Sequence, residues 1–202
     1  MPVIPPNDKP APPTVMANVI GVIENQAPTR HLRLHMSVLQ DEVREDLSRD
    51  IAKLALVERH RGSGRVQLGL VHGFGFDLPC AVGTTVAHDS HQMLIAGTDD
   101  ANMAQAANVL AEVGGGQVVV RQGEVIGLVE LPIAGLMSSE RVEVVAQKAT
   151  TILDGFRACG CTLNNPNMQL SLLSLAVIPE LRLTDLGLVD VIRREFIPTL
   201  DV

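Results

Sequence analysis

The amino-acid sequence predicts a single α/β domain of the α+β kind, in which helices pack on one mixed β-sheet. Two observations lead to this prediction. Apolar strand-like segments alternate with two segments of helical periodicity, and several of the strand-like segments follow one another across short glycine turns, as in hairpins. A chain of 202 residues is also near the size of one domain. We therefore expect both parallel and antiparallel neighbours in the sheet.

The strands are predicted from apolar segments and their alternation. Residues 15–22, 51–58 and 65–72 have strand character, and a basic, glycine-containing turn joins the last two as a hairpin. Residues 170–178 form a long apolar run that predicts a buried strand. Residues 39–50 are charged and fit a short helix or an exposed connection.

The clearest helix is expected at residues 101–113. Thr98 is expected to cap it, and three glycines at 114–116 end it because they permit the left-handed backbone conformation. A hairpin over 117–131 should follow directly. The second helix is expected to begin at a capping Ser138 and to run to about Arg157, with one apolar face at helical spacing.

The N-terminal residues differ from the rest of the chain. Residues 1–14 contain six of the twelve prolines, and each proline fixes φ and lacks an N–H donor. We predict an extended arm over residues 1–14, and a folded domain over residues 15–202.

The composition is that of a globular chain with an aliphatic core. Hydrophobic residues make up 46% of the chain and charged residues 19%, whereas aromatic residues make up 2%, all of them Phe. The formal net charge of −7 argues against a nucleic-acid-binding surface, which usually has a basic stripe. There is no apolar run of about 18 residues and no disulfide framework. We therefore expect a soluble, cytoplasmic protein without nucleic-acid or membrane partners.

The segment from Val71 to Gly97 holds the best candidates for a functional site. It contains three of the six histidines and several closely spaced glycines. Imidazoles transfer protons near pH 7, and a neighbouring carboxylate can fix their tautomer. The alternative is that these polar groups only hydrogen-bond a buried turn. The catalytic candidates are His88, Asp89, Ser90 and His91.

A second group of residues is predicted to bind substrate. Alternating glycines around Phe74 and Phe76 let the backbone approach a ligand, and exposed Phe rings would stack on a flat heterocycle. The alternative places both rings in the core. We expect this segment to meet the catalytic candidates at one surface cleft, and we assign no metal ligand to the chain. The substrate-binding candidates are His72, Gly73, Phe74, Gly75, Glu58 and His60.

Several of these motifs resemble the C-terminal domain of bacterial and archaeal adenine deaminases. The order and spacing of the motifs fit from roughly Val19 to the end of the chain, although Gln92 stands where Asn is expected. The matching segments are Glu58–His60, Gly73–Gly75, Val86–His91, Leu131–Ser138, Val177–Leu181, Leu183–Asp185 and Gly187–Asp190.

The resemblance implies hydrolytic deamination of adenine to hypoxanthine and ammonia. In this family a divalent metal, Mn or Fe, is expected in an amidohydrolase (β/α)₈ barrel that precedes the matched domain. Because such a barrel needs about 250 residues, we expect this chain to lack it and to act as a separate subunit in a homo- or hetero-oligomer with a barrel partner. Two alternatives stay open. One is a non-catalytic module with a regulatory role or a role in binding a purine-like ligand. The other is an independent metal-dependent hydrolase that uses His88 and His91.

Overall fold

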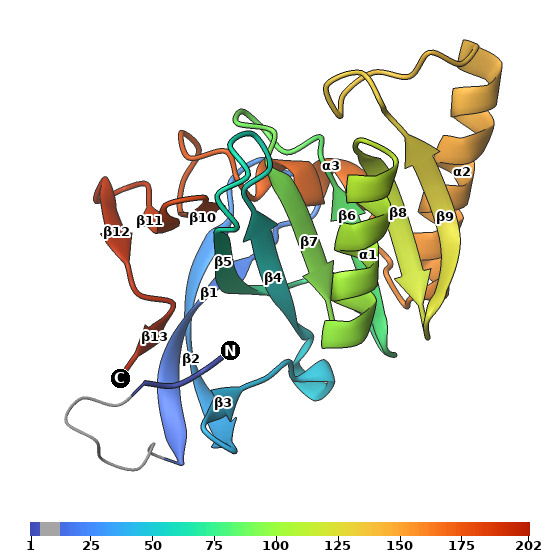
Figure 1. The fold of residues 1–202 in the computed structure, drawn as a ribbon. Helices are drawn as coiled ribbons and strands as arrows, with labels where there is room; N and C mark the ends of the chain where they lie inside the picture. Colours follow the sequence, from blue (N-terminus) through green and yellow to red (C-terminus); the bar gives the residue numbers. More distant parts are fainter. Residues whose placement is uncertain (5–12) are drawn as a thin grey trace.

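The computed structural model describes residues 1–4 and 13–202 and confirms the predicted fold class (Figure 1). The described strands form one large sheet and one small sheet. The strands of the large sheet are β1 (Thr14–Gly21), β2 (Arg30–Leu39), β3 (Glu42–Val43), β4 (Ile51–Val57), β5 (Val66–His72), β6 (Cys80–Thr84), β7 (Met93–Gly97), β8 (Gly116–Arg121), β9 (Glu124–Glu130) and β13 (Leu200–Asp201). Those of the small sheet are β10 (Leu181–Thr184), β11 (Gly187–Asp190) and β12 (Glu195–Ile197).

The large sheet is mixed, as the sequence predicts. Its strand order is β3-β2-β1-β5-β4-β7-β6-β8-β9, and β13 pairs with β1. Strands β1 and β5 run parallel, whereas the other pairs among the described strands are antiparallel. The predicted hairpins are β4–β5 and β8–β9.

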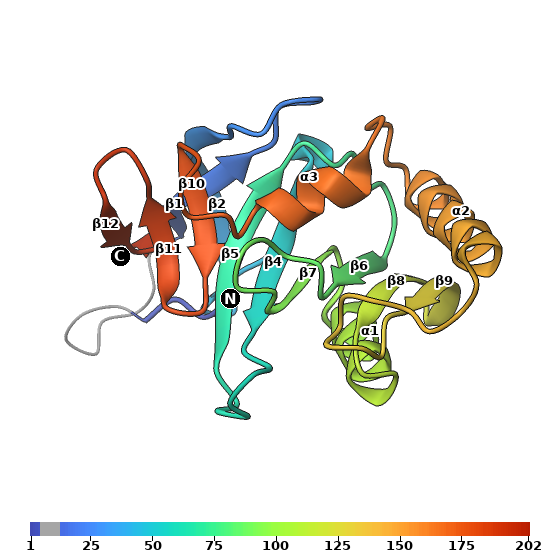
Figure 2. The same ribbon diagram turned by 90° about the horizontal axis from the view of Figure 1, so that it is seen from above.

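Three helices within the described residues cover the two faces of this sheet. Helix α1 (Asp100–Glu112) lies on one face, and α2 (Val142–Ala158) and α3 (Pro166–Leu172) lie on the other, as Figure 2 shows from above. Side chains along a strand alternate between the faces. Leu54 and Leu56 of β4 therefore join the core under α2 and α3, whereas Ala55 joins the core under α1. Among the described residues, no helix is long and apolar enough to cross a membrane.

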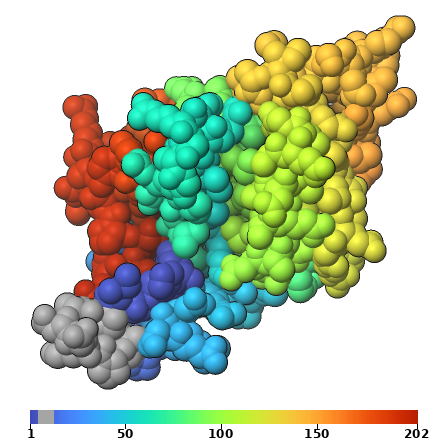
Figure 3. Space-filling model, viewed as in Figure 1, coloured from blue at the N-terminus to red at the C-terminus, as the bar shows by residue number. Residues whose placement is uncertain are grey.

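The remaining part of the sheet is covered by segments from the two ends of the chain. The small sheet packs on β5, where a Cβ added to Gly69 would lie 3.5 Å from a Leu183 methyl group. On the opposite face, Val3 is buried in a third cluster with Val19, Met36 and Leu70. Figure 3 shows the N-terminal residues in blue and the C-terminal residues in red on one side of the β4–β5 hairpin, and α1 on the other side.

The first helix is capped one residue later than predicted. The Asp99 carboxylate accepts a hydrogen bond from Asn102 N at 2.8 Å and is the N-cap. Thr98 is buried, and its hydroxyl donates to the Leu78 carbonyl at 2.7 Å. The threonine side chain is thus engaged at the start of β6, which leaves the cap to the aspartate.

The second helix is shorter than predicted. It begins at Val142, and Arg141 precedes it without a side-chain cap. The Ser138 hydroxyl accepts instead from Glu140 N at 3.1 Å, inside the loop. A local serine turn has therefore replaced the expected cap.

The predicted buried strand at 170–178 is wrong. Residues up to Leu172 belong to α3, which has Pro166 in its first turn and an Asn165 side chain that accepts from Met168 N at 3.3 Å. An Asn-Pro pair is a helix-start signal. Leu170 and Leu173 then share a buried helical face.

Residues 39–50 are neither only a short helix nor only an exposed connection, which are the two predicted alternatives. They contain the short strand β3, which pairs with β2, and the 3₁₀ turn η2 (Leu47–Arg49). The predicted arm lies mainly at residues 5–12, which are outside the described residues. Within its described part, Pro2 bridges to Glu42, and Thr14 already belongs to β1.

Candidate functional site

The predicted catalytic residues lie at one end of the large sheet. Val57, the last residue of β4, pairs with Met93, the first residue of β7, so the segments that continue from them emerge side by side. The loop between β9 and α2 reaches the same end through hydrogen bonds of Ala134 and Gly135. We call this end the upper edge, because it lies at the top of Figure 1.

Glu58 shapes the turn that follows β4. It is 7% exposed, and its carboxylate accepts hydrogen bonds from the backbone N–H groups of His60, Arg61 and Ser63 and from the Ser63 hydroxyl, at 2.6–3.1 Å. The bonds from Ser63, followed by those from Arg61 and His60, lower the pKa of Glu58 to about 2. Both oxygens are therefore occupied in the turn, and the glutamate stays ionised at neutral pH.

The turn places His60 against the loop that contains the catalytic candidates. His60 Nε2 donates to the Ser90 carbonyl oxygen at 2.6 Å, which fixes this ring as the Nε2–H tautomer. Asp89 and Ser90 are exposed. His60, a predicted substrate-binding residue, therefore lies next to the segment that holds the catalytic candidates.

His88 and His91 lie close together at this edge. Their ring centroids are 5.3 Å apart and the rings are inclined by 69°. Burial, followed by the nearby His88 and Arg59, lowers the pKa of His91, so this imidazole is neutral at pH 7. Its Nδ1 atom is buried and has no hydrogen-bond partner in the part of the chain that the structure describes.

The Asp89 carboxylate does not fix the tautomer of a neighbouring histidine through a hydrogen bond in the described part of the chain. Within the described residues, no hydrogen bond joins its carboxylate to the ring of His88 or His91. The loop is held through its backbone instead. His91 N donates to the Ala87 carbonyl at 2.7 Å, and His91 has a positive φ of 50°. The exposed Asp89 carboxylate is therefore free to meet solvent or a ligand.

Helix α3 supports His88 from behind. His88 N donates to the Ser171 carbonyl at 3.0 Å, and the Ser174 hydroxyl donates to the His88 carbonyl at 2.9 Å. The position of this imidazole therefore depends on a segment more than 80 residues further along the chain.

Arg59 joins three segments of the upper edge and was missed as a site residue. Its Nε donates to the His91 carbonyl and its Nη2 to the Ala134 carbonyl, both at 2.7 Å, while its backbone N donates to Gln92 Oε1 at 2.9 Å. A Cβ on Gly135 would lie 2.7 Å from the guanidinium. The only sequence signal was its place between Glu58 and His60, because its partners are distant carbonyl groups.

Thr85 fixes the loop after β9 to the glycine-rich end of α1. Its hydroxyl donates to the Gly135 carbonyl at 2.7 Å and accepts from Gly116 N at 2.8 Å. Gly115 has φ +117°, and a Cβ there would lie 2.5 Å from Gly135 Cα. These glycines are thus required for close backbone packing. A cavity of about 260 Å³ beside them is lined by Arg59, Thr85, Met93, Leu110, Ala111, Gly114 and Gly115.

The predicted substrate-binding segment at His72–Gly75 does not reach this site. Strands β4 and β5 pair with Ile51 opposite His72 and Val57 opposite Val66. At about 3.3 Å per residue, six steps put His72 about 20 Å from the upper edge. The expected common cleft with His88–His91 is therefore wrong.

The Phe rings of this segment are also enclosed. Phe74 is 2% exposed and Phe76 is 3% exposed. Their centroids are 5.3 Å apart, and both stack on Phe156 of α2. The alternative interpretation, in which the glycines tuck two Phe rings into the core, is correct. Gly75 N donates to Asp50 Oδ1 and closes the turn.

The upper edge does not assemble a metal site by itself. Among the residues that the structure describes, no group of three or more His, Cys, Asp or Glu side chains could hold a metal ion. Within residues 1–4 and 13–202, His88 and His91 therefore have no third protein ligand of the kind that a catalytic zinc site uses. Among the described residues, His88 and His91 alone do not make up the ligand set that the alternative of an independent metal-dependent hydrolase needs.

Comparisons with known proteins agree with the resemblance of the motifs. The family described as adenine deaminase C-terminal domain matches residues 26–195. Adenine deaminase 3 of Rhizobium meliloti (strain 1021) is 56% identical over 181 residues, which are 90% of this chain and 30% of that protein. The adenine deaminase of Roseobacter denitrificans is 54% identical over 93% of this chain, and that of Moorella thermoacetica 49% over 89%.

Fold and site together define a mixed-sheet α/β domain with a histidine-containing loop at one edge. The chain belongs to the adenine deaminase C-terminal domain family. It spans about 30% of the length of the curated relatives that it matches.

Proposed function

We propose that this chain is a subunit that docks onto an amidohydrolase barrel and helps it to hydrolyse adenine to hypoxanthine and ammonia. The observation that supports this most directly is the gathering of three histidines at the upper edge. His60, His88 and His91 come from two segments that are separate in the sequence, and one buried ring nitrogen of His91 has no partner in the described residues. Family membership points to the same reaction.

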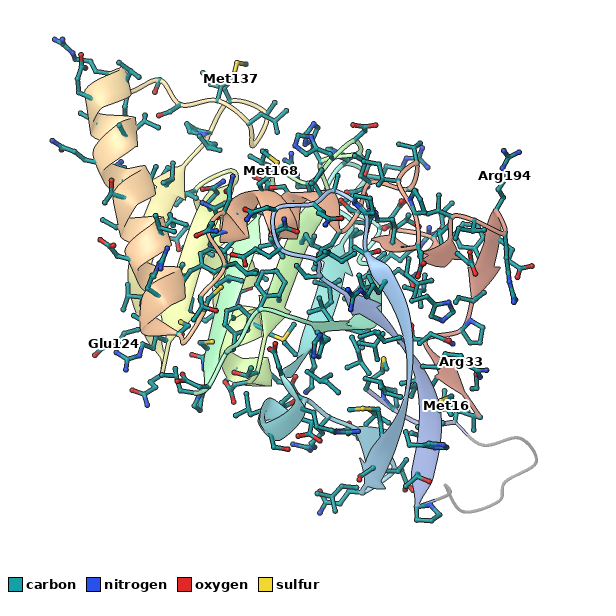
Figure 4. The ribbon with its side chains drawn as sticks, turned by 180° about the vertical axis from the view of Figure 1, so that it is seen from behind. Met16, Arg33, Glu124, Met137, Met168 and Arg194 are labelled. Carbon is teal, nitrogen blue, oxygen red and sulfur yellow. The ribbon has the colours of Figure 1, made fainter. Side chains whose placement is uncertain are left out.

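The surface around these histidines suits a protein partner. Ile133, Met137 and Met168 are 45%, 57% and 46% exposed. The first two flank the residues that contact Arg59, and Met168 lies on the helix that supports His88. Figure 4 labels Met137 and Met168, seen from behind. Exposed apolar side chains around polar groups are typical of a protein–protein interface.

The imidazoles supply proton transfer in this proposal. Addition of water to adenine and departure of ammonia require a group that accepts a proton and a group that donates one. His91 is neutral at pH 7 and so is ready to accept a proton. Exposed Asp89 and Ser90 would contact the substrate or the mouth of the barrel. A divalent metal in the barrel, Mn or Fe by resemblance, would activate the attacking water.

The experiment is an ammonia-release assay on adenine with the chain alone and with a co-expressed candidate barrel. We expect turnover only when both are present, together with a stoichiometric complex. His88→Gln and His91→Gln should each lower kcat at least about 100-fold, the usual range for a general acid or base. His35→Gln, at an exposed histidine of β2, is the matched control and should keep full activity.

The same samples distinguish the other functions. Full activity of the barrel without this chain, or no complex in any stoichiometry, would contradict the proposal. Calorimetric binding of adenine or hypoxanthine to the chain alone, without ammonia release in any combination, would instead indicate a non-catalytic purine-binding module. The cytoplasmic location and the oligomeric state stay predictions that fractionation and light scattering test.

A further inference from the structure

A second cavity lies at the end of the sheet opposite the upper edge. It forms where β1 and β5 end beside each other, with Gly21 paired to His72, and where β2 begins. Its volume is about 370 Å³, within the range of about 300–1,000 Å³ that small-molecule sites occupy. It is separate from the histidines of the proposed function, so it requires its own explanation.

The walls of this cavity are apolar. They are made by Val22, Leu32 and Leu34, all half-buried. Gly21 completes the wall, and a Cβ at this position would lie 3.0 Å from a Leu32 methyl group and 3.2 Å from Arg30 Cβ. Leu32 therefore packs close against the Gly21 backbone, which a side chain at position 21 would prevent. A ligand would contact mainly aliphatic groups here.

The polar groups that line the cavity are all basic. They are Arg30, Arg49 and His72, and among the described residues no carboxylate lines the cavity. The basic lining of the cavity is opposite in sign to the formal net charge of the whole chain, which is −7. A ligand in this cavity would therefore meet the Arg30 guanidinium, which has no carboxylate partner in the described part of the chain, on a predominantly negative protein.

The two arginines differ in how they are held. Arg49 is fixed, since its Nε donates to Asp46 Oδ2 at 2.7 Å and its Nη1 to the His35 carbonyl at 2.9 Å. In the described part of the chain, the Arg30 guanidinium has no hydrogen bond or ion pair, and the His72 ring has none either. Arg30 and His72 thus bring donors that are not already used.

We propose that this cavity binds a small organic oxyanion, a carboxylate or a phosphate monoester on a compact apolar body. Guanidinium groups match the two oxygens of such anions in a bidentate geometry. The aliphatic walls would hold the body of the ligand, and Arg30, Arg49 and His72 would hold its charged end. His72 is thus a ligand-binding residue of this cavity instead of the upper edge.

The test uses benzoate and phenyl phosphate as probes, benzamide as a neutral analogue and inorganic phosphate as a bare anion. Binding is followed by methyl NMR of Leu32 and Leu34 and by calorimetry on the whole chain. We expect saturable shifts with benzoate or phenyl phosphate, and at least tenfold weaker binding of benzamide. Inorganic phosphate should bind more weakly than phenyl phosphate, because it lacks the apolar body.

Substitutions locate the site. Arg30→Gln should weaken binding at least tenfold, and Arg49→Gln should do the same if its circular dichroism spectrum is unchanged. Arg44→Gln is the control, because Arg44 is an exposed arginine paired with Glu42 outside the cavity. The proposal is overturned if neither organic anion gives saturable shifts, if benzamide binds as tightly as benzoate, or if Arg44→Gln weakens binding as much as Arg30→Gln.

Discussion

The two ends of the β4–β5 hairpin use similar residues in opposite ways. At the upper edge, a histidine-rich loop is anchored by its backbone and leaves Asp89 and Ser90 exposed. At the other end, a glycine-rich segment turns Phe74 and Phe76 inward onto Phe156 and seals the core. Glycine-rich and histidine-containing segments therefore indicate an unusual backbone conformation. Only the neighbouring strands decide whether the side chains of such a segment are exposed at a site or buried in the core.

The largest effect is expected at the sealed end. Phe74→Ala removes a 2% exposed ring from a three-ring stack and should lower the free energy of unfolding by about 3–5 kcal/mol. Urea denaturation measures this. Phe196→Ala, at a 58% exposed ring, is the control and should change it by less than about 0.5 kcal/mol. Equal effects of the two substitutions would mean that the stack does not stabilise the core.

A smaller loss is expected from the buried polar contact behind the upper edge. Thr85→Val keeps the shape of the side chain but leaves Gly116 N without its hydroxyl acceptor and the Gly135 carbonyl without its donor. Each unpaired buried group costs about 1–3 kcal/mol, so we expect a loss of that order in urea denaturation. Thr150→Val, on an exposed helical position, should be nearly neutral. A neutral Thr85→Val would show that the loop after β9 is held by other contacts.

The next effect depends on pH, and it concerns Glu58. The folded state lowers the pKa of Glu58 from 4.5 to about 2, so the ionised carboxylate stabilises the fold above pH 4.5. This contribution is lost as the pH falls from 4.5 towards 2, because the unfolded chain binds the proton first. Glu58→Gln should therefore reduce the fall in unfolding free energy between pH 5 and about 2.5. If the unfolding free energies of the unsubstituted chain and of Glu58→Gln fall equally between pH 5 and about 2.5, Glu58 does not have this role.

The smallest effect on stability is expected at the catalytic candidates. His88→Ala removes a half-buried ring whose main-chain bonds to Ser171 and Ser174 persist. We expect the free energy of unfolding to change by less than about 0.5 kcal/mol, as for other surface substitutions. Thermal and urea unfolding measure this on the chain alone. Loss of folding in His88→Ala would make the histidine structural and would remove the contrast between the two ends.

Much of the local structure follows from the sequence. Alternating apolar residues placed β4 and β5, and the acidic start and triple-glycine end of α1 placed the first helix within two residues. Chemistry within a few positions sets these features, so no distant contact is needed to infer them. The motifs around His88, Gly135 and Asp190 likewise led to the correct family without a structure.

Only the tertiary structure decided which segments meet. The antiparallel register of β4 with β5 and β7 separates His72 from His88, although only 15 residues lie between them in the chain. The register of β4 with β7 also brings Arg59 to His91, and the pairing of β6, β8 and β9 brings Ala134 to the same arginine. Strand register depends on pairing between distant residues, and the carbonyl partners of Arg59 have no side-chain signature. The sequence therefore determined β4, β5, α1 and the candidate residues, while long-range pairing determined which of the candidates meet.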